Sequence, residues 1–194
     1  MLDTKARHLV QPMVDGVANL LLKVGLTANH VTCIAFFIGI SSGVFIYFDQ
    51  PIWALAVLWL SGFLDVVDGT MARKTTSTPF GTVLDVSFDR LVEISVLLGL
   101  AFRYPDVMWA LLLVSVSIIF SMTIFLTVGA VSEKKGIKTF YYQPGMAERT
   151  EGFIFFSLMI IFTNYYIIYI ALIFLAVQIF TSVQRLNEAR KILV

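Results

Sequence analysis

The chain has 194 residues, of which 58% are hydrophobic and only 14% are charged, and its mean hydropathy is +0.86. Soluble domains are about 45–50% apolar with roughly a quarter of their residues charged, so this composition excludes a soluble enzyme, a nucleic-acid-binding protein and a disordered tail. Fourteen basic and thirteen acidic residues nearly cancel to a net charge of +1, and the single cysteine, Cys33, excludes an intrachain disulfide.

Residues 1–26 are predicted to form an amphipathic helix that lies in the membrane interface. Its apolar side chains recur at helical spacing and face away from a polar stripe that consists of Gln11, Asp15 and Asn19. Because these polar residues would interrupt the apolar core of a signal peptide, we do not expect one here. We expect the helix to begin or to kink at Pro12, since proline removes a helical hydrogen bond.

Residues 27–194 are predicted to form a bundle of six transmembrane helices, so that residues 1–194 make one all-α integral membrane domain. A bilayer core of about 30 Å requires around 20 helical residues. The apolar segments are residues 31–48, 52–64, 84–102, 107–131, 153–163 and 165–183. The second and third reach spanning length only if they include the polar residues 65–72 and 81–89, and Thr163 and Asn164 would form a tight hairpin between the last two.

Basic residues predict the orientation of this bundle. In a six-span arrangement, all of the fourteen lysines and arginines except Arg103 fall on one side of the membrane. Because cytoplasmic loops are enriched in lysine and arginine, both termini are predicted to be cytoplasmic. Gly39 and Gly43 form a G-x-x-x-G pattern, which we expect to serve helix packing within the chain rather than between two copies.

Four aspartates near the cytoplasmic ends of two predicted spans are the candidate functional residues. Asp65 and Asp68 are three positions apart and Asp85 and Asp89 four apart, so each pair shares one helix face. The short connection between the two helices, which contains Pro79, makes them antiparallel neighbours whose carboxylates meet. Such a site suits Mg²⁺ or Mn²⁺, and four aspartates provide for two ions. Pairing with Arg73 and Arg90 would account for two of the acids but not for all four.

Small residues beside these aspartates indicate a pocket for a bulky anionic group. Gly69 follows Asp68, Ala72 keeps the same face small, and Gly81 is expected to open the helix that carries Asp85. Arg73 adds a fixed cation that suits phosphate. Together with the carboxylates, these residues predict a site for a metal-bound diphosphate, where two metal ions would assist a phosphoryl-type displacement.

Residues 65–89 resemble the signature of the CDP-alcohol phosphotransferase family, also called CDP-alcohol phosphatidyltransferases. That signature is D-x2-D-G-x2-A-R-x7–8-G-x3-D-x3-D, and every specified position is present. The resemblance implies a metal-dependent membrane enzyme that releases CMP from a CDP-alcohol. It implies that Asp65, Asp68 and Asp85 bind the metal pair, and that Asp89 completes the metal site and acts as the catalytic general base.

The same resemblance implies residues that contact the nucleotide. In the motif these are Gly69, Arg73, Thr78 and Gly81. Asn29 and Thr32 resemble the nucleotide-contacting entry to the first span, although Ala28 stands where the family usually has proline. His30, between them, is expected to be structural.

The short chain is similar to bacterial and archaeal family members that use CDP-diacylglycerol, or its ether-lipid analogue, and a small polar acceptor, which implies a prokaryotic cell membrane. Inositol phosphate and glycerol phosphate are the leading acceptors, and serine is a further candidate. Residues 145–151 resemble the entry to the fifth span in the inositol-phosphate branch, which implies that Arg149 binds the acceptor, whereas the apolar residues 126–131 depart from that branch. Lys134, Lys135 and Lys138 are either acceptor ligands or ordinary loop charge. The family also implies a homodimer.

Four alternatives remain open at this stage. The enzyme could transfer from a CDP-linked small alcohol to a lipid hydroxyl. An intramembrane prenyltransferase would need D-x2-D-x3-D, but Ala72 stands at the third aspartate position. A divalent-cation transporter would need a second acidic cluster across the membrane, and a lipid-binding scaffold would not need an intact motif. Release of CMP rather than pyrophosphate distinguishes the transferase from the prenyltransferase.

Overall fold

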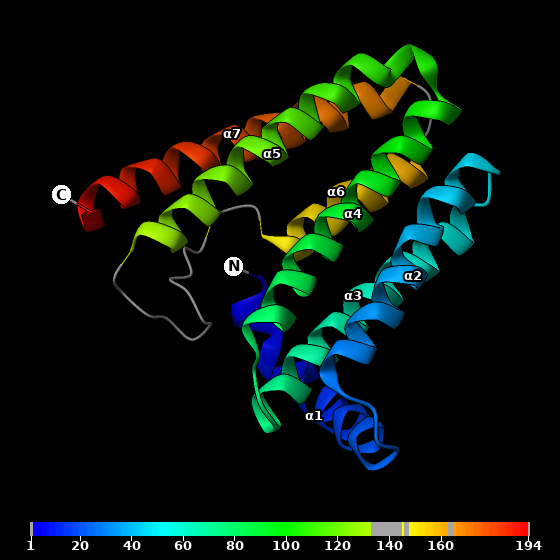
Figure 1. The fold of residues 1–194 in the computed structure, drawn as a ribbon. Helices are drawn as coiled ribbons and strands as arrows, with labels where there is room; N and C mark the ends of the chain where they lie inside the picture. The colour runs from blue at the N-terminus through cyan, green and yellow to red at the C-terminus, as the bar shows by residue number, and fades with distance from the viewer. Residues whose placement is uncertain (1, 133–144, 146–147, 163–164, 194) are drawn as a thin grey trace. The chain divides into compact units, whose positions relative to one another are not determined.

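All regular structure in the described part of the chain is helical. The computed structural model describes residues 2–132, 145, 148–162 and 165–193. In chain order the elements are α1 (Leu2–Lys23), α2 (Ala28–Tyr47), α3 (Pro51–Lys74), α4 (Pro79–Arg103), the 3-10 helix η1 (Pro105–Val107), α5 (Met108–Val131), α6 (Arg149–Ile161) and α7 (Tyr165–Leu193) (Figure 1). The predicted all-α class is confirmed.

The helices form two compact units. The N-terminal unit comprises Lys5–Arg103, and the C-terminal unit comprises Tyr104–Val194 together with Met1–Thr4. In the N-terminal unit, α2 packs along both α3 and α4. In the C-terminal unit, α7 packs along both α5 and α6. All four predicted aspartates therefore belong to the N-terminal unit, and Arg149 belongs to the C-terminal unit.

Four of the described helical segments are long and apolar enough to cross a membrane. They are Ala28–Tyr47, Pro51–Lys74, Pro105–Val131 and Tyr166–Leu193. The other two predicted spans are also helical, but α6 has only 13 residues, about 20 Å at 1.5 Å per residue. Helix α4 is 25 residues long and carries charged side chains from Asp85 to Glu93. The chain is an integral membrane protein.

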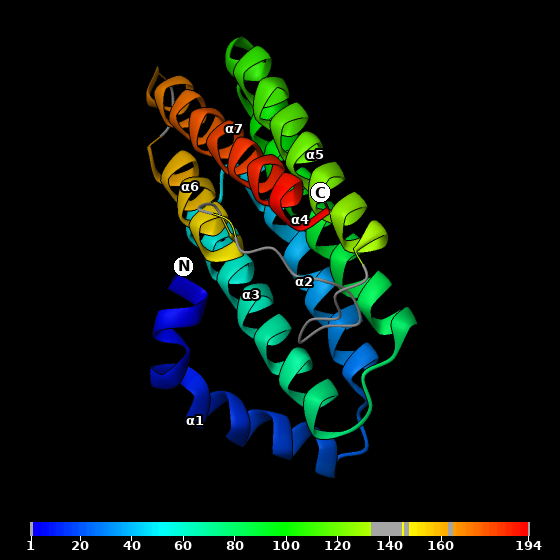
Figure 2. The ribbon, with the colours of Figure 1, turned by 90° about the vertical axis from the view of Figure 1, so that its left-hand side faces the viewer.

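Helix α1 covers most of the predicted segment 1–26, and the proline lies within it. It runs from Leu2 with Pro12 in its interior, so of the two alternatives predicted for Pro12, a helix start or a kink, the start does not apply. A proline inside a helix costs one hydrogen bond and bends the axis, and Figure 2 shows α1 as a bent helix. Its inner side chains Val14 and Ala18 are buried against α2 and α3. Packing therefore compensates for the interrupted helical ladder.

The turn from α1 to α2 is fixed by local chemistry. Gly25 has φ +88°, the left-handed conformation that glycine adopts without strain, and the amides of Gly25 and Leu26 donate to the carbonyls of Leu22 and Leu21. Thr27 then caps α2: its hydroxyl accepts from the His30 amide, while His30 Nδ1 accepts from the Thr27 amide. The structural role predicted for His30 is confirmed, and Asn29 is held in the first turn of α2.

Glycines allow α2 and α4 to approach closely. A Cβ added to Gly43 would collide with the backbone of Ser95, and one added to Gly99 would collide with the backbone of Gly43. A Cβ added to Gly39 would collide with the side chains of Val92 on α4 and Ser61 on α3. The prediction that the G-x-x-x-G pattern serves packing within the chain is therefore confirmed. This contact fixes the helix that carries Asp85 and Asp89 against the helix that carries Asn29.

Candidate functional site

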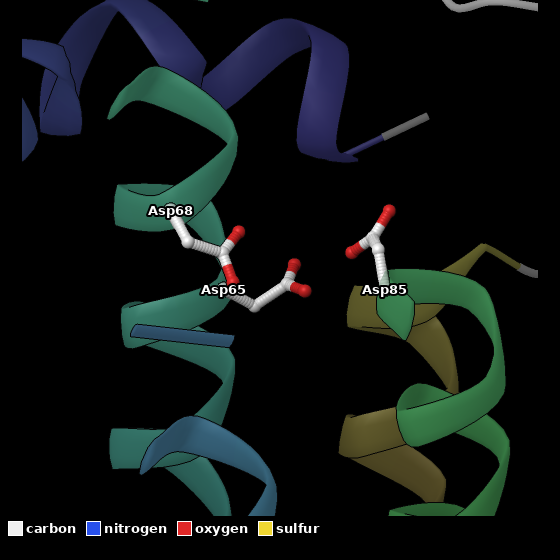
Figure 3. Close-up of side chains that lie close together, drawn as sticks. All are labelled: Asp65, Asp68 and Asp85. Carbon is white, nitrogen blue, oxygen red and sulfur yellow. The ribbon is translucent and has the colours of Figure 1, made fainter. Parts of the chain in front are cut away.

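Three of the four predicted aspartates converge. Asp65 and Asp68 project from α3 and Asp85 projects from α4, and their carboxylates point toward one another (Figure 3). One carboxylate oxygen from each lies within 4.8 Å of the others. Asp68 is buried, with 4% of its surface exposed, and Asp65 and Asp85 are half-buried. Because α3 and α4 both pack along α2, these two consecutive helices present the side chains to each other.

The donor set of this aspartate cluster (Asp65, Asp68 and Asp85) fits a hard divalent cation. Carboxylate oxygens are the ligands that Mg²⁺ and Mn²⁺ prefer, and three ionised carboxylates this close repel one another without a cation. Ligands on opposite sides of an ion at about 2.1 Å lie about 4.2 Å apart. The oxygens of the cluster, within 4.8 Å of one another, therefore reach ligand distance after small side-chain rotations.

Asp89 lies one helical turn beyond Asp85, on the same face of α4. Four residues of helix advance the chain by about 6 Å, so Asp89 is not among the three carboxylates that share the 4.8 Å cluster. It is half-buried. Asp89 therefore lies beside the three carboxylates that could hold a metal ion.

Three residues predicted to contact the nucleotide also meet. The amide of Gly81 donates to Thr78 Oγ1 at 3.0 Å. Asn29 Oδ1 lies 2.8 Å from the position that a Cβ would occupy on Gly81, so a larger residue would displace it. Helix α4 begins at Pro79 rather than at the predicted Gly81. Gly81 thus serves the close approach of α2 and α4 near their N-termini rather than opening the helix.

The other residues of this unit that are predicted to contact the nucleotide make contacts within their own helices. Arg73 is exposed at the end of α3, where it donates from Nη2 to Thr70 Oγ1 at 2.7 Å. Its Nη1 lies 3.4 Å from the Cβ position of Gly69, so the small residue leaves room for the guanidinium. Thr32 is buried and donates its hydroxyl to the carbonyl of Ala28 at 3.0 Å, a bond within its own helix.

Lys74 at the end of α3 binds Asp15 and Asn19 of α1, a contact that we call the tether and that the sequence did not indicate. The Lys74 ammonium lies 2.6 Å from an oxygen of Asp15 and donates to Asn19 Oδ1 at 2.9 Å. These partners are more than fifty positions apart, and the sequence showed Asp15 and Asn19 only as a polar stripe. The hydrogen bond from Lys74, with a second from Gln11 at 3.2 Å, holds the pKa of Asp15 below its ordinary value. The tether fixes Lys74, the residue that follows Arg73 in the chain.

Arg149 is the first residue of α6 in the C-terminal unit. Glu148 and Glu151 form a capping box around the start of this helix. The Arg149 guanidinium lies 5.3 Å from the ring centroid of Phe153. Lys134, Lys135 and Lys138, the other predicted acceptor residues, and the hairpin at Thr163 and Asn164 lie outside the described residues.

A second arginine of the C-terminal unit was not singled out from the sequence. Arg185 is 7% exposed, donates from Nη1 to Ser121 Oγ at 3.0 Å, and lies 4.9 Å from the ring centroid of Phe125. Gly145 passes against it, since a Cβ there would lie 3.3 Å from Nε and Nη2. The sequence indicated Arg185 only as one of the basic residues on the cytoplasmic side. It lies just beyond the last apolar run, residues 165–183, where an exposed side chain is expected.

Comparison with known proteins independently supports the family resemblance of residues 65–89. The sequence profile of the CDP-alcohol phosphatidyltransferase family matches residues 25–184. The chain is 31% identical to the archaetidylinositol phosphate synthase of Pyrococcus horikoshii over 97% of this chain and 96% of that protein. It is 32% identical to the phosphatidylinositol phosphate synthase of Corynebacterium glutamicum over 98% of this chain and 90% of that protein.

The fold is also similar to a solved structure. The crystal structure of the Mycobacterium tuberculosis phosphatidylinositol phosphate synthase with CDP-DAG bound gives a TM-score of 0.75 at 24% identity, and the match covers 92% of this chain and 94% of that one. A second structure of the same enzyme, in complex with manganese and citrate, also gives 0.75. At this level of identity the likeness shows a shared fold.

Proposed function

Because the chain belongs to the CDP-alcohol phosphatidyltransferase family, we propose that it transfers a phosphatidyl group from CDP-diacylglycerol to a hydroxyl of inositol phosphate and releases CMP. The observation that carries this proposal is the aspartate cluster, which lies within a complete family signature. The names of the two synthases that match almost the whole chain support inositol phosphate over glycerol phosphate as the acceptor.

The donor is assigned to the N-terminal unit. Asp65, Asp68 and Asp85 would hold two Mg²⁺ or Mn²⁺ ions, which when bound neutralise the diphosphate and make CMP a better leaving group. The manganese complex of the solved relative supports this choice of ion. The remaining residues assigned to the CDP moiety are Asn29, Thr32, Gly69, Arg73, Thr78 and Gly81. Arg73 cannot lose its proton, so its role is to bind phosphate.

Asp89 is assigned two roles. It completes the metal site, and as the general base it takes the proton from the acceptor hydroxyl. The acceptor oxygen then forms a bond to the phosphorus of the phosphatidyl group, and the bond from that phosphorus to the CMP oxygen breaks. General-base assistance of this kind is typically worth about 10²–10⁴-fold in rate.

The acceptor is assigned to the C-terminal unit. Arg149 would bind the phosphate of inositol phosphate, because a guanidinium offers two parallel donors to phosphate oxygens. Its place in residues 145–151, the segment that resembles the inositol-phosphate branch, supports this. Arg185, in the same unit, offers the same chemistry, and its burial holds the guanidinium in one position.

The membrane arrangement follows from the same reasoning. We place both termini and the active site on the cytoplasmic side of a prokaryotic cell membrane, with six spans in one domain over residues 1–194. Helix α1 would lie in the interface, and an exposed apolar stripe at helical spacing supports this: Val10, Met13, Leu20 and Val24. Family membership also leads us to propose a homodimer.

The proposal is tested by the products that the purified enzyme makes from CDP-diacylglycerol in the presence of Mg²⁺ or Mn²⁺. Inositol phosphate, glycerol phosphate, serine and inositol are supplied separately, and CMP and the lipid product are identified by mass. We expect CMP and phosphatidylinositol phosphate only with inositol phosphate. Turnover with another acceptor would replace the acceptor assignment. Turnover only with a CDP-linked small alcohol and a lipid hydroxyl would reverse the donor assignment, and pyrophosphate would indicate a prenyltransferase.

A further inference from the structure

An ion pair on α4 immediately follows the proposed base, Asp89, in the sequence. Arg90 Nη2 is 2.7 Å from Glu93 Oε1, and the side chains are 27% and 6% exposed, respectively. A nearly buried carboxylate at the depth of a membrane helix is costly unless a cation accompanies it. Nothing in the family signature, which ends at Asp89, explains why this part of α4 carries two further charges.

The position of Glu93 continues the line of carboxylates on α4. Asp85, Asp89 and Glu93 are four residues apart in turn, so they share one face of the helix. Glu93 is one turn beyond Asp89, about 6 Å along the helix axis. Without its arginine, it would extend the negative charge of the site by one further turn. Without the glutamate, Arg90 would place an uncompensated positive charge beside Asp89.

We propose that the Arg90–Glu93 pair holds the net charge next to the metal site at zero, and thereby sets its affinity for divalent cations. This inference rests on the proposed function. Both residues are positioning residues, since neither is assigned a contact with substrate or metal. At an effective dielectric constant of about 20, a single uncompensated charge roughly 10 Å from a divalent ion changes its binding by at least about tenfold.

The test compares two variants with the wild type. Glu93→Gln removes the negative charge and leaves Arg90 uncompensated, so the dissociation constant for Mn²⁺ should rise about tenfold or more. The double variant R90M/E93Q removes both charges at similar volume, a replacement that proteins often tolerate. It should return the dissociation constant to within about threefold of wild type. A merely structural role would make the double variant at least as weak as E93Q.

Mn²⁺ binding is measured on the purified proteins from the electron paramagnetic resonance signal of free Mn²⁺, with CMP release recorded in parallel. Asp49→Asn is the matched control, because it breaks another ion pair of α4, between Asp49 and Arg103 at 2.9 Å. Arg103 is fourteen residues beyond Asp89, about 21 Å along the helix. We expect D49N to bind Mn²⁺ as the wild type does.

The outcomes separate this inference from the proposed function. A wild type that neither binds Mn²⁺ nor releases CMP would contradict the proposed function itself. A wild type that binds Mn²⁺, with an E93Q variant that binds it equally well, would overturn only the charge-compensating role. So would a double variant as weak as E93Q, because rescue by the second substitution is what distinguishes charge from packing.

Discussion

Asp89 is the residue on which the proposed chemistry depends most, because it stands one turn outside the aspartate cluster. Asp89→Asn keeps the shape of the side chain and a metal-ligand oxygen but removes its basicity. We expect CMP release to fall by about 10²–10⁴-fold, the usual contribution of a general base. The measurement is CMP release at saturating Mn²⁺ and donor. A variant that keeps the wild-type rate would exclude Asp89 as the base.

Gly81 tests the nucleotide side of the site at the same scale. A Cβ on Gly81 would lie 2.8 Å from Asn29 Oδ1 and 3.0 Å from Thr78 Oγ1, so Gly81→Ala must displace one or both. Loss of one hydrogen bond costs about 0.5–1.5 kcal/mol, so we expect the KM for the CDP-alcohol to rise by up to about tenfold. Gly16→Ala is the control, since no atom lies within 4 Å of its Cβ position. Equal KM values for the two variants would contradict the assignment.

The aspartate cluster shows what sequence reasoning could reach at this scale. The spacing of Asp65, Asp68 and Asp85 predicted their convergence because regular helices fix which side chains share a face. The pairs of Lys74 with Asp15 and of Arg185 with Ser121 could not be predicted, because they join residues more than fifty positions apart. Such contacts depend on how separate helices pack, and no local pattern records that packing.

At the scale of elements, the contact between α2 and α4 is the most sensitive to substitution. Gly43→Ala would drive a methyl group into the backbone of Ser95, which cannot move aside as a flexible side chain can. Overpacking of this kind typically costs about 1–3 kcal/mol, so we expect a lower Tm. Gly16→Ala in α1 has open space and should leave the Tm unchanged or raise it slightly. A Gly43→Ala variant as stable as wild type would contradict the close packing of α2 and α4.

The tether between α1 and α3 predicts a pH dependence of stability. The pKa of Asp15 is below its ordinary value of 3.8 in the folded protein, chiefly because Lys74 hydrogen-bonds to it. The tether therefore contributes stability above the ordinary pKa and loses it as the pH falls through the lower, folded value. We expect Asp15→Asn to lower the Tm at neutral pH and to match the wild type well below pH 3.8. A Tm difference that persists in acid would assign the effect to packing instead.

The helices themselves were largely predictable, for an identifiable reason. Hydrophobic runs predicted α2, α5 and most of α7, and the length needed to span a membrane extended the second segment through residues 65–72 of α3, which ends at Lys74. The sequence left open whether α1 starts or kinks at Pro12, because the burial of Val14 and Ala18 that offsets an interior proline depends on packing. The apolar run 153–163 located α6, but the helix begins four residues earlier, at Arg149, because apolar composition does not specify a polar first turn.

At the scale of the whole molecule, the distribution of charge predicts the topology. Of the fourteen lysines and arginines in the sequence, only Arg103, at the end of α4, would lie on the far side of the membrane. A fluorescent protein fused to either terminus should therefore be bright in the cytoplasm, and alkaline phosphatase inserted at the turn that follows Arg103 should be active outside. Phosphatase activity at a terminus would contradict the proposed orientation, and with it the cytoplasmic active site.

The central claim is that the aspartate cluster binds the divalent cation that CMP release requires. The most direct measurement is CMP release from CDP-diacylglycerol and inositol phosphate by wild type and Asp68→Asn, each titrated with Mn²⁺ after treatment with a chelator. We predict no release from the chelated wild type, recovery on addition of Mn²⁺, and little or no recovery in the variant, because the buried carboxylate of Asp68 is one of three that converge. Release at the wild-type rate from the chelated enzyme, or full recovery in Asp68→Asn, would contradict the account.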